Sequence, residues 1–202
     1  QVVLFMAATA RMRWRQAHPQ RMWRTQQLAP PAAVPADTVS IFTDGSAVPR
    51  KLGQPKPIAG YGVVCVHGDD PDDRGGTGHA IFEMCGPIVP DRLVHKNTTN
   101  NLAELVAFTH GLRWALHTHH GSVLMRYDST YAANIAAGLW KPKKHQAAAA
   151  RAIKLWADVR RQRPNLWLKH VKGHSNHRWN NRADRLADAG RAGRHAYDTV
   201  VD

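Results

Sequence analysis

The order of the predicted elements constrains the fold of this chain more than any other feature of its sequence. Apolar, β-branched segments predict five strands, at residues 39–43, 61–66, 80–85, 122–127 and 166–171. Helical spacing of apolar residues predicts helices at 102–117, 146–161 and 180–191, with a short one ending near 137. The order β-β-β-α-β-α-α-β-α indicates an α/β domain with a five-stranded mixed sheet and helices on both faces.

The chain divides into a basic tail with a linker over residues 1–37, a folded domain over 38–193 and a short tail over 194–202. The linker, residues 29–37, holds three Pro among small side chains, which disfavour both helix and strand. The tail carries five Arg and no acid before this linker, with Trp14 and Trp23 among the arginines. That mixture suits RNA binding through residues 11–24, and it also suits a targeting segment.

Charge points to a polyanionic partner, because 28 Lys and Arg face 15 Asp and Glu, for a net charge of +13. A second basic block covers residues 139–185, so we expect nucleic acid as the partner. No apolar run approaches ~18 residues, and we expect no membrane span. We expect an intracellular protein, with mitochondrion, nucleus and cytoplasm not distinguished. The chain begins at Gln1, so its start is processed, cut from a longer product or missing.

Four carboxylates lie at positions where a sheet would gather them. Asp44 follows the first strand, where Asp-Gly-Ser predicts a turn, and Asp128 follows the fourth strand. Glu104 lies in the first turn of one helix, and Asp184 in the first turns of the last. If the first and fourth strands are parallel neighbours, Asp44 and Asp128 end side by side. Such a cluster would repel itself unless divalent cations compensate it, and hard oxygen ligands suit Mg²⁺ or Mn²⁺.

Six segments in this order resemble type 1 ribonuclease H over roughly residues 38–193. They are Ile41-Phe42-Thr43-Asp44-Gly45-Ser46, Gly60-Tyr61-Gly62-Val63-Val64, Thr98-Thr99-Asn100-Asn101-Leu102-Ala103-Glu104-Leu105, Tyr127-Asp128-Ser129-Thr130-Tyr131, Val171-Lys172-Gly173-His174-Ser175-Asn176-His177 and Asn180-Asn181-Arg182-Ala183-Asp184-Arg185-Leu186-Ala187. The resemblance implies an RNase H-like fold and hydrolysis of the RNA strand of RNA/DNA hybrids, leaving 5′-phosphate ends.

The resemblance also implies roles for individual residues. Asp44, Glu104, Asp128 and Asp184 would form a catalytic tetrad that holds two Mg²⁺ ions, with Mn²⁺ as the other candidate. His174 would help to protonate the leaving group or to release product. The nucleic-acid contacts would be Gly45, Ser46, Thr99, Asn100, Asn101, Thr130, Trp140, Lys143 and Lys144.

Other interpretations stay open at this point. Asp44 and Asp128 could each be a simple cap, Asn100 and Asn101 could only cap a helix, and Trp140 could be core. As to function, the chain could be an active endoribonuclease, free or cut from a retroelement polyprotein. It could instead be an RNase H-like subunit of a ribonucleoprotein such as a ribosome, held on ribosomal or other structured RNA by its basic tail. A DNA transposase or junction resolvase is a more distant interpretation.

Overall fold

The computed structural model describes residues 28–48, 59–89, 98–173 and 175–199. Within these residues the chain forms six strands and four helices. In chain order they are β1 (Val39–Ala47), β2 (Ala59–His67), β3 (His79–Ile88), α3 (Asn100–His117), β4 (Val123–Tyr127), α4 (Thr130–Ala136), α5 (Gln146–Gln162), β5 (Leu166–His170), α6 (Arg178–Arg191) and β6 (Ala196–Thr199).

The strands form one mixed sheet in the order β5-β4-β1-β2-β3-β6. β1, β2 and β3 pair antiparallel in chain order, whereas β4 runs parallel to β1 and β5 parallel to β4. The expected number of five strands was wrong by one, because β6 pairs antiparallel with the outer edge of β3. This strand has only four residues, Ala-Tyr-Asp-Thr, and its Tyr197 packs edge-on against Phe82 with ring centroids 4.8 Å apart. Its place in the sheet therefore depends on β3 and not on an apolar pattern of its own.

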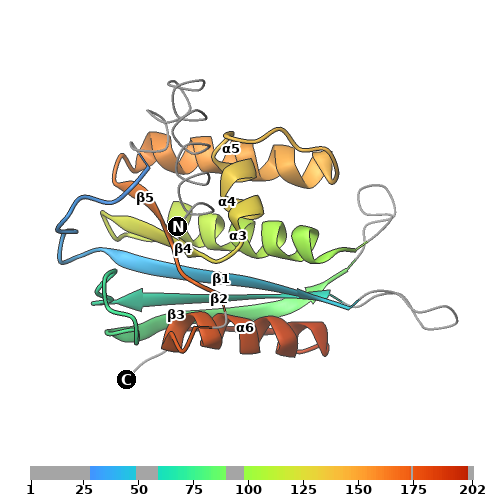
Figure 1. The fold of residues 1–202 in the computed structure, drawn as a ribbon, viewed down its shortest axis with the longest axis horizontal. Helices are drawn as coiled ribbons and strands as arrows, with labels where there is room; N and C mark the ends of the chain where they lie inside the picture. The colour runs from blue at the N-terminus through green and yellow to red at the C-terminus, as the bar shows by residue number, and fades with distance from the viewer. Residues whose placement is uncertain (1–27, 49–58, 90–97, 174, 200–202) are drawn as a thin grey trace, which may run out of the picture.

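Helices cover both faces of the sheet, as predicted (Figure 1). α3 packs on β1 and β2, α5 packs outside α3, and α6 packs on β1, β2 and β3 from the opposite face. Successive side chains of β1 point to opposite faces of the sheet, so neighbouring residues belong to different cores. Ile41 faces the cluster that contains α3 and α5, whereas Phe42 faces the cluster that contains α6.

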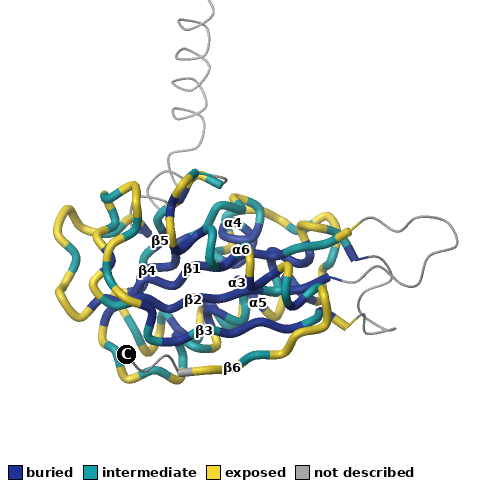
Figure 2. The backbone as a smooth tube through the Cα atoms, turned by 90° about the horizontal axis from the view of Figure 1, so that it is seen from below, coloured by how far each residue is buried: buried dark blue, intermediate teal, exposed yellow. Residues whose placement is uncertain are grey.

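The buried part of the molecule follows the central strands, while β6 lies exposed at the edge (Figure 2). Leu28, which precedes the expected start of the domain, also belongs to the core. Its side chain is buried, and its carbonyl oxygen accepts a hydrogen bond of 2.6 Å from the amide of Leu168 in β5. A search of the described residues for a helix able to cross a membrane finds none of sufficient length and apolarity.

Candidate active site

Asp44 and Asp128 come from the two parallel strands at the centre of the sheet. In the register of β1 and β4, Thr43 lies opposite Tyr127, so the next residue on each strand is one of the two carboxylates. The expectation that they end side by side is confirmed. The turn expected at Asp44-Gly45-Ser46 was wrong, because β1 continues to Ala47. β2 runs beside this whole stretch, and its backbone pairing holds the segment extended.

Gly45 brings the start of α3 against β1 and so carries Glu104 toward Asp44. A Cβ atom at position 45 would lie 2.1 Å from the carbonyl carbon of Ala103 and 2.2 Å from the amide nitrogen of Glu104. No side chain fits in that space, so glycine is required here for close approach and not for a turn. Thr99 caps the helix, since its hydroxyl accepts a hydrogen bond from the Leu102 amide.

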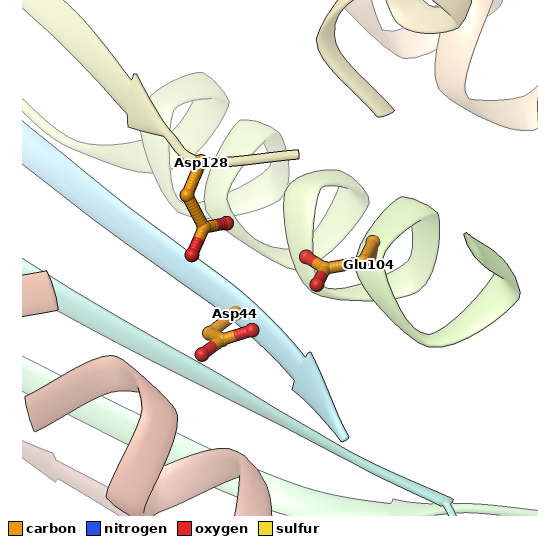
Figure 3. Close-up of side chains that lie close together, drawn as sticks. All are labelled: Asp44, Glu104 and Asp128. Carbon is orange, nitrogen blue, oxygen red and sulfur yellow. The ribbon is translucent and has the colours of Figure 1, made fainter. Parts of the chain in front are cut away.

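The three carboxylates of Asp44, Glu104 and Asp128 point into one space (Figure 3). Each offers an oxygen atom, and these oxygens all lie within 4.8 Å of one another. Asp44 and Glu104 are each only 8% exposed. Burial, together with the charge of Asp128, raises the pKa of Asp44 to about 7. Burial and the charges of Asp44 and Asp128 raise the pKa of Glu104 to about 10.

Asp184 is the one predicted carboxylate that comes from α6. It lies half-buried on α6, and its charge contributes to the raised pKa of Asp44. It is not among the three side chains whose oxygens lie within 4.8 Å of one another. One helical turn earlier, Asn180 donates a hydrogen bond of 3.3 Å to Oδ2 of Asp128. Sequence analysis placed this residue in a family segment but gave it no role.

The carboxylates fit a divalent cation. Oδ1 of Asp128 is buried and lacks a hydrogen-bond partner, although it lies in a cluster of like charges. A hard cation bound there would satisfy this oxygen and offset the repulsion. Asp44, Glu104 and Asp128 would hold it.

A groove of about 630 Å³ opens beside the first turn of α3. Five predicted nucleic-acid contacts line it, namely Thr99, Asn101, Trp140, Lys143 and Lys144. Trp140 is 44% exposed, so it is not a core residue. Tyr131 and His145 also line the groove, and His145 Nε2 lies 2.9 Å from the Thr99 hydroxyl oxygen. Sequence analysis missed His145 because nothing in its local sequence set it apart among 13 His.

The remaining predicted contacts are more dispersed. Asn100 and Thr130 are exposed at the first residues of α3 and α4. The Ser46 hydroxyl already donates to Oδ1 of Asp188 at 2.6 Å and accepts from Nε of Arg191 at 2.9 Å. The amide of Gly45 donates a hydrogen bond of 2.7 Å to Oδ1 of Asp44. His174 and residues 11–24 lie outside the described residues.

Comparison with known proteins decides the family. Residues 36–192 match the RNase H family profile. The chain belongs to the RNase H family. It is 31% identical to Ribonuclease H of Idiomarina loihiensis over 161 residues, which cover 74% of this chain and 85% of the relative. It is 32% identical to Ribonuclease H of Pseudomonas fluorescens over 164 residues, covering 77% and 93%. The crystal structure of RNase H1 from Halobacterium salinarum shares the RNase H fold, with a TM-score of 0.54 at 24% identity over 76% of this chain and 96% of that one.

Proposed function

We propose that this RNase H family chain hydrolyses the RNA strand of RNA/DNA hybrids, with Asp44, Glu104, Asp128 and Asp184 as the catalytic carboxylates. The observation that carries the proposal is the cluster of three carboxylates, two of them on buried residues, whose oxygens lie within 4.8 Å of one another. A cluster of this kind binds cations strongly because no ion pair among the described residues neutralises it. Family membership supports both the reaction and its substrate.

Two bound Mg²⁺ ions, or Mn²⁺ in their place, would supply Lewis-acid polarisation of the phosphodiester and a water of lowered pKa. The residues of the chain do the rest. With cations bound, the carboxylates of Asp44 and Glu104 would be ionised and would hold the ions, although both residues are only 8% exposed. Asn180 fixes the orientation of Asp128 through its hydrogen bond. His174 moves a proton to the leaving oxygen or assists product release, as in the family that the chain resembles.

The groove beside α3 would bind the DNA strand of the hybrid. Trp140 offers an apolar face against a deoxyribose, and Lys143 and Lys144 offer charge to its phosphates. Asn100, at the exposed start of α3, faces the RNA strand and reads its 2′-hydroxyl groups. Contacts of this kind are to backbone and sugar, so the enzyme would show little base preference. The interpretation as a ribonucleoprotein subunit rests on residues 11–24, and no observation on the described residues favours it.

The experiment is a cleavage assay with purified chain, Mg²⁺ and a hybrid whose RNA strand is labelled. Cleavage of that strand to 5′-phosphate products, with duplex RNA and duplex DNA left intact, is the expected result. Asp44→Asn serves as the inactive control, and Asp198→Asn, at an exposed position on β6, as the active one. A folded wild-type chain that leaves the hybrid intact in both Mg²⁺ and Mn²⁺ contradicts the proposal.

A further inference from the structure

The loop between β2 and β3 is acidic, with Asp69, Asp70, Asp72 and Asp73, and yet one of these carboxylates is buried. The side chain of Asp69 has no exposed surface, and its Oδ2 lies 3.4 Å from Nη1 of Arg126, whose side chain is 3% exposed. The same Nη1 donates a hydrogen bond of 3.1 Å to the carbonyl oxygen of Pro71. Arg126 of β4 therefore binds the loop through both a carboxylate and its backbone.

Arg126 lies on β4, two residues before Asp128, which directly follows that strand. The Arg126 side chain projects toward the face that α6 covers, and Asn180 of α6 contacts Asp128 there. There the Arg126 guanidinium lies 5.2 Å from the centre of the Phe42 ring, and its Nη2 lies 3.5 Å from Nε2 of His177. His177 is 2% exposed and is the N-cap residue of α6. The buried arginine thus contacts the start of α6 as well as the loop.

The loop also holds the first turn of α6 directly. The amide of Arg178 donates to the carbonyl oxygen of Gly75 at 2.9 Å, and Nε1 of Trp179 donates to the carbonyl oxygen of Thr77 at 2.6 Å. The next residue is Asn180, which is buried and donates to Asp128. The anchored turn is therefore the turn that orients an active-site carboxylate, and Asp184 follows one turn later.

We propose that Arg126, paired with Asp69, is a positioning residue of the active site. The pair fixes the β2–β3 loop and the start of α6 against β4, and so holds Asn180 and Asp184 at the distance that the other carboxylates require. A buried ion pair seldom adds stability over apolar residues of similar volume, so its contribution here is the placement of these elements. The proposal rests on the proposed function, since it gives the carboxylates their catalytic role.

The test replaces both partners, because either single loss of charge leaves the other charge buried and unpaired. The double variant Asp69→Leu with Arg126→Met is expected to fold with a Tm close to that of the wild type. Its kcat for hybrid cleavage is expected to fall about tenfold or more, and its KM to stay within about twofold. Mg²⁺ affinity, measured by calorimetry without hybrid, is expected to fall about tenfold as well, since Asp128 loses its fixed orientation.

Two further variants make the result specific. Asp72→Asn with Lys169→Gln removes an exposed ion pair from the same loop, and it should leave kcat and Mg²⁺ affinity unchanged. Arg126→Lys keeps a charge beside Asp69 but loses the contact between Nη2 and His177, so it should show a partial loss of kcat and Mg²⁺ affinity, smaller than that of the double variant. A double variant that folds with wild-type kcat and Mg²⁺ affinity overturns the proposal.

If the double variant does not fold, Arg126→Lys decides. A lowered Tm with unchanged kcat and Mg²⁺ affinity then overturns the proposal, whereas partial loss of both supports it. A wild type that binds Mg²⁺ without cleaving hybrid overturns the proposed function instead, and the calorimetry still tests the positioning role.

Discussion

Removing one charge from the carboxylate cluster should stabilise the metal-free protein. Asp44 is 8% exposed and lies beside two other carboxylates. Asp44→Asn replaces its carboxylate with an uncharged amide of the same shape. The pKa of Asp44 is raised from 3.8 to about 7, and each pKa unit corresponds to about 1.4 kcal/mol. An ionised Asp44 therefore destabilises the metal-free fold by up to about 4 kcal/mol. Part of this is relieved when Glu104 takes up a proton, so we expect a gain of about 1–3 kcal/mol.

The sign of the effect depends on pH in a defined way. A carboxyl group whose pKa is raised by folding contributes stability when it is protonated, and this contribution is lost as pH rises toward about 7. The advantage of Asp44→Asn should therefore be small near pH 4, grow as pH rises and level off above about pH 7. For a domain of this size, a gain of about 2 kcal/mol corresponds to a rise in Tm of roughly 4–8 °C.

Thermal melts from pH 4 to pH 8.5 in EDTA measure this directly, with Asp198→Asn as the matched control at an exposed site. Adding Mg²⁺ should narrow the difference, because the ion binds the native wild type and stabilises it by mass action. An Asp44→Asn protein that melts below the wild type at pH 8 in EDTA would refute the electrostatic account. So would a Tm difference that is independent of pH.

Two other substitutions and one deletion test separate parts of the protein. Gly45→Ala should lower stability by about 1–3 kcal/mol and abolish most cleavage, because its Cβ would meet the α3 backbone. Gly75→Ala, whose Cβ would come no closer than 3.6 Å to the Asp73 carboxylate, should do neither. Equal Tm and activity for the two would count against the close-packing argument. His174→Ala should slow turnover by ~10²–10⁴-fold with Mg²⁺ binding unchanged, measured against the exposed His195→Ala. An unchanged rate across pH 6–9 would exclude the proton-transfer role. Deleting residues 1–27, a cut that keeps the buried Leu28, should leave the melting curve unchanged. With five Arg removed, it should flatten the slope of log K against log salt for hybrid binding by about 3.5–4.5, and identical slopes would mean that the tail contacts no phosphate.

The sequence predicted the central part of the site because local patterns determine it. The apolar, β-branched run of β1 and the helical spacing of α3 define the two elements that carry Asp44 and Glu104. Parallel pairing of β1 and β4 then places Asp128 beside Asp44. The same logic failed at Asp-Gly-Ser, where turn chemistry dominated the interpretation. There Gly45 is required because the backbone of Ala103, far away in sequence, packs directly against it, and no local pattern reveals this contact.

The buried ion pair shows the same limit more sharply. Asp69 lies among three other aspartates, a composition typical of a solvated loop, and Arg126 lies on a strand where a polar residue normally faces water. Both charges are buried only because the fold brings these two residues, 57 positions apart in the sequence, together beneath α6. β6 is a comparable case, since a four-residue segment with one Asp becomes a strand only through the free edge of β3.

Glu104 is the residue whose position is hardest to reconcile with a purely structural role. It sits on the face of α3 that otherwise carries core residues such as Leu105 and Phe108, and it is as buried as Asp44. No ion pair among the described residues reaches it, while two carboxylates do. An apolar side chain there would remove the repulsion and add to the core. In the metal-free protein the ionised form of Glu104 therefore opposes folding, and its placement becomes favourable when a cation binds the three carboxylates. Metal binding and folding are for that reason coupled through the same side chains. In the metal-free protein, the apolar contacts of α3 must offset the destabilisation that the carboxylate cluster causes.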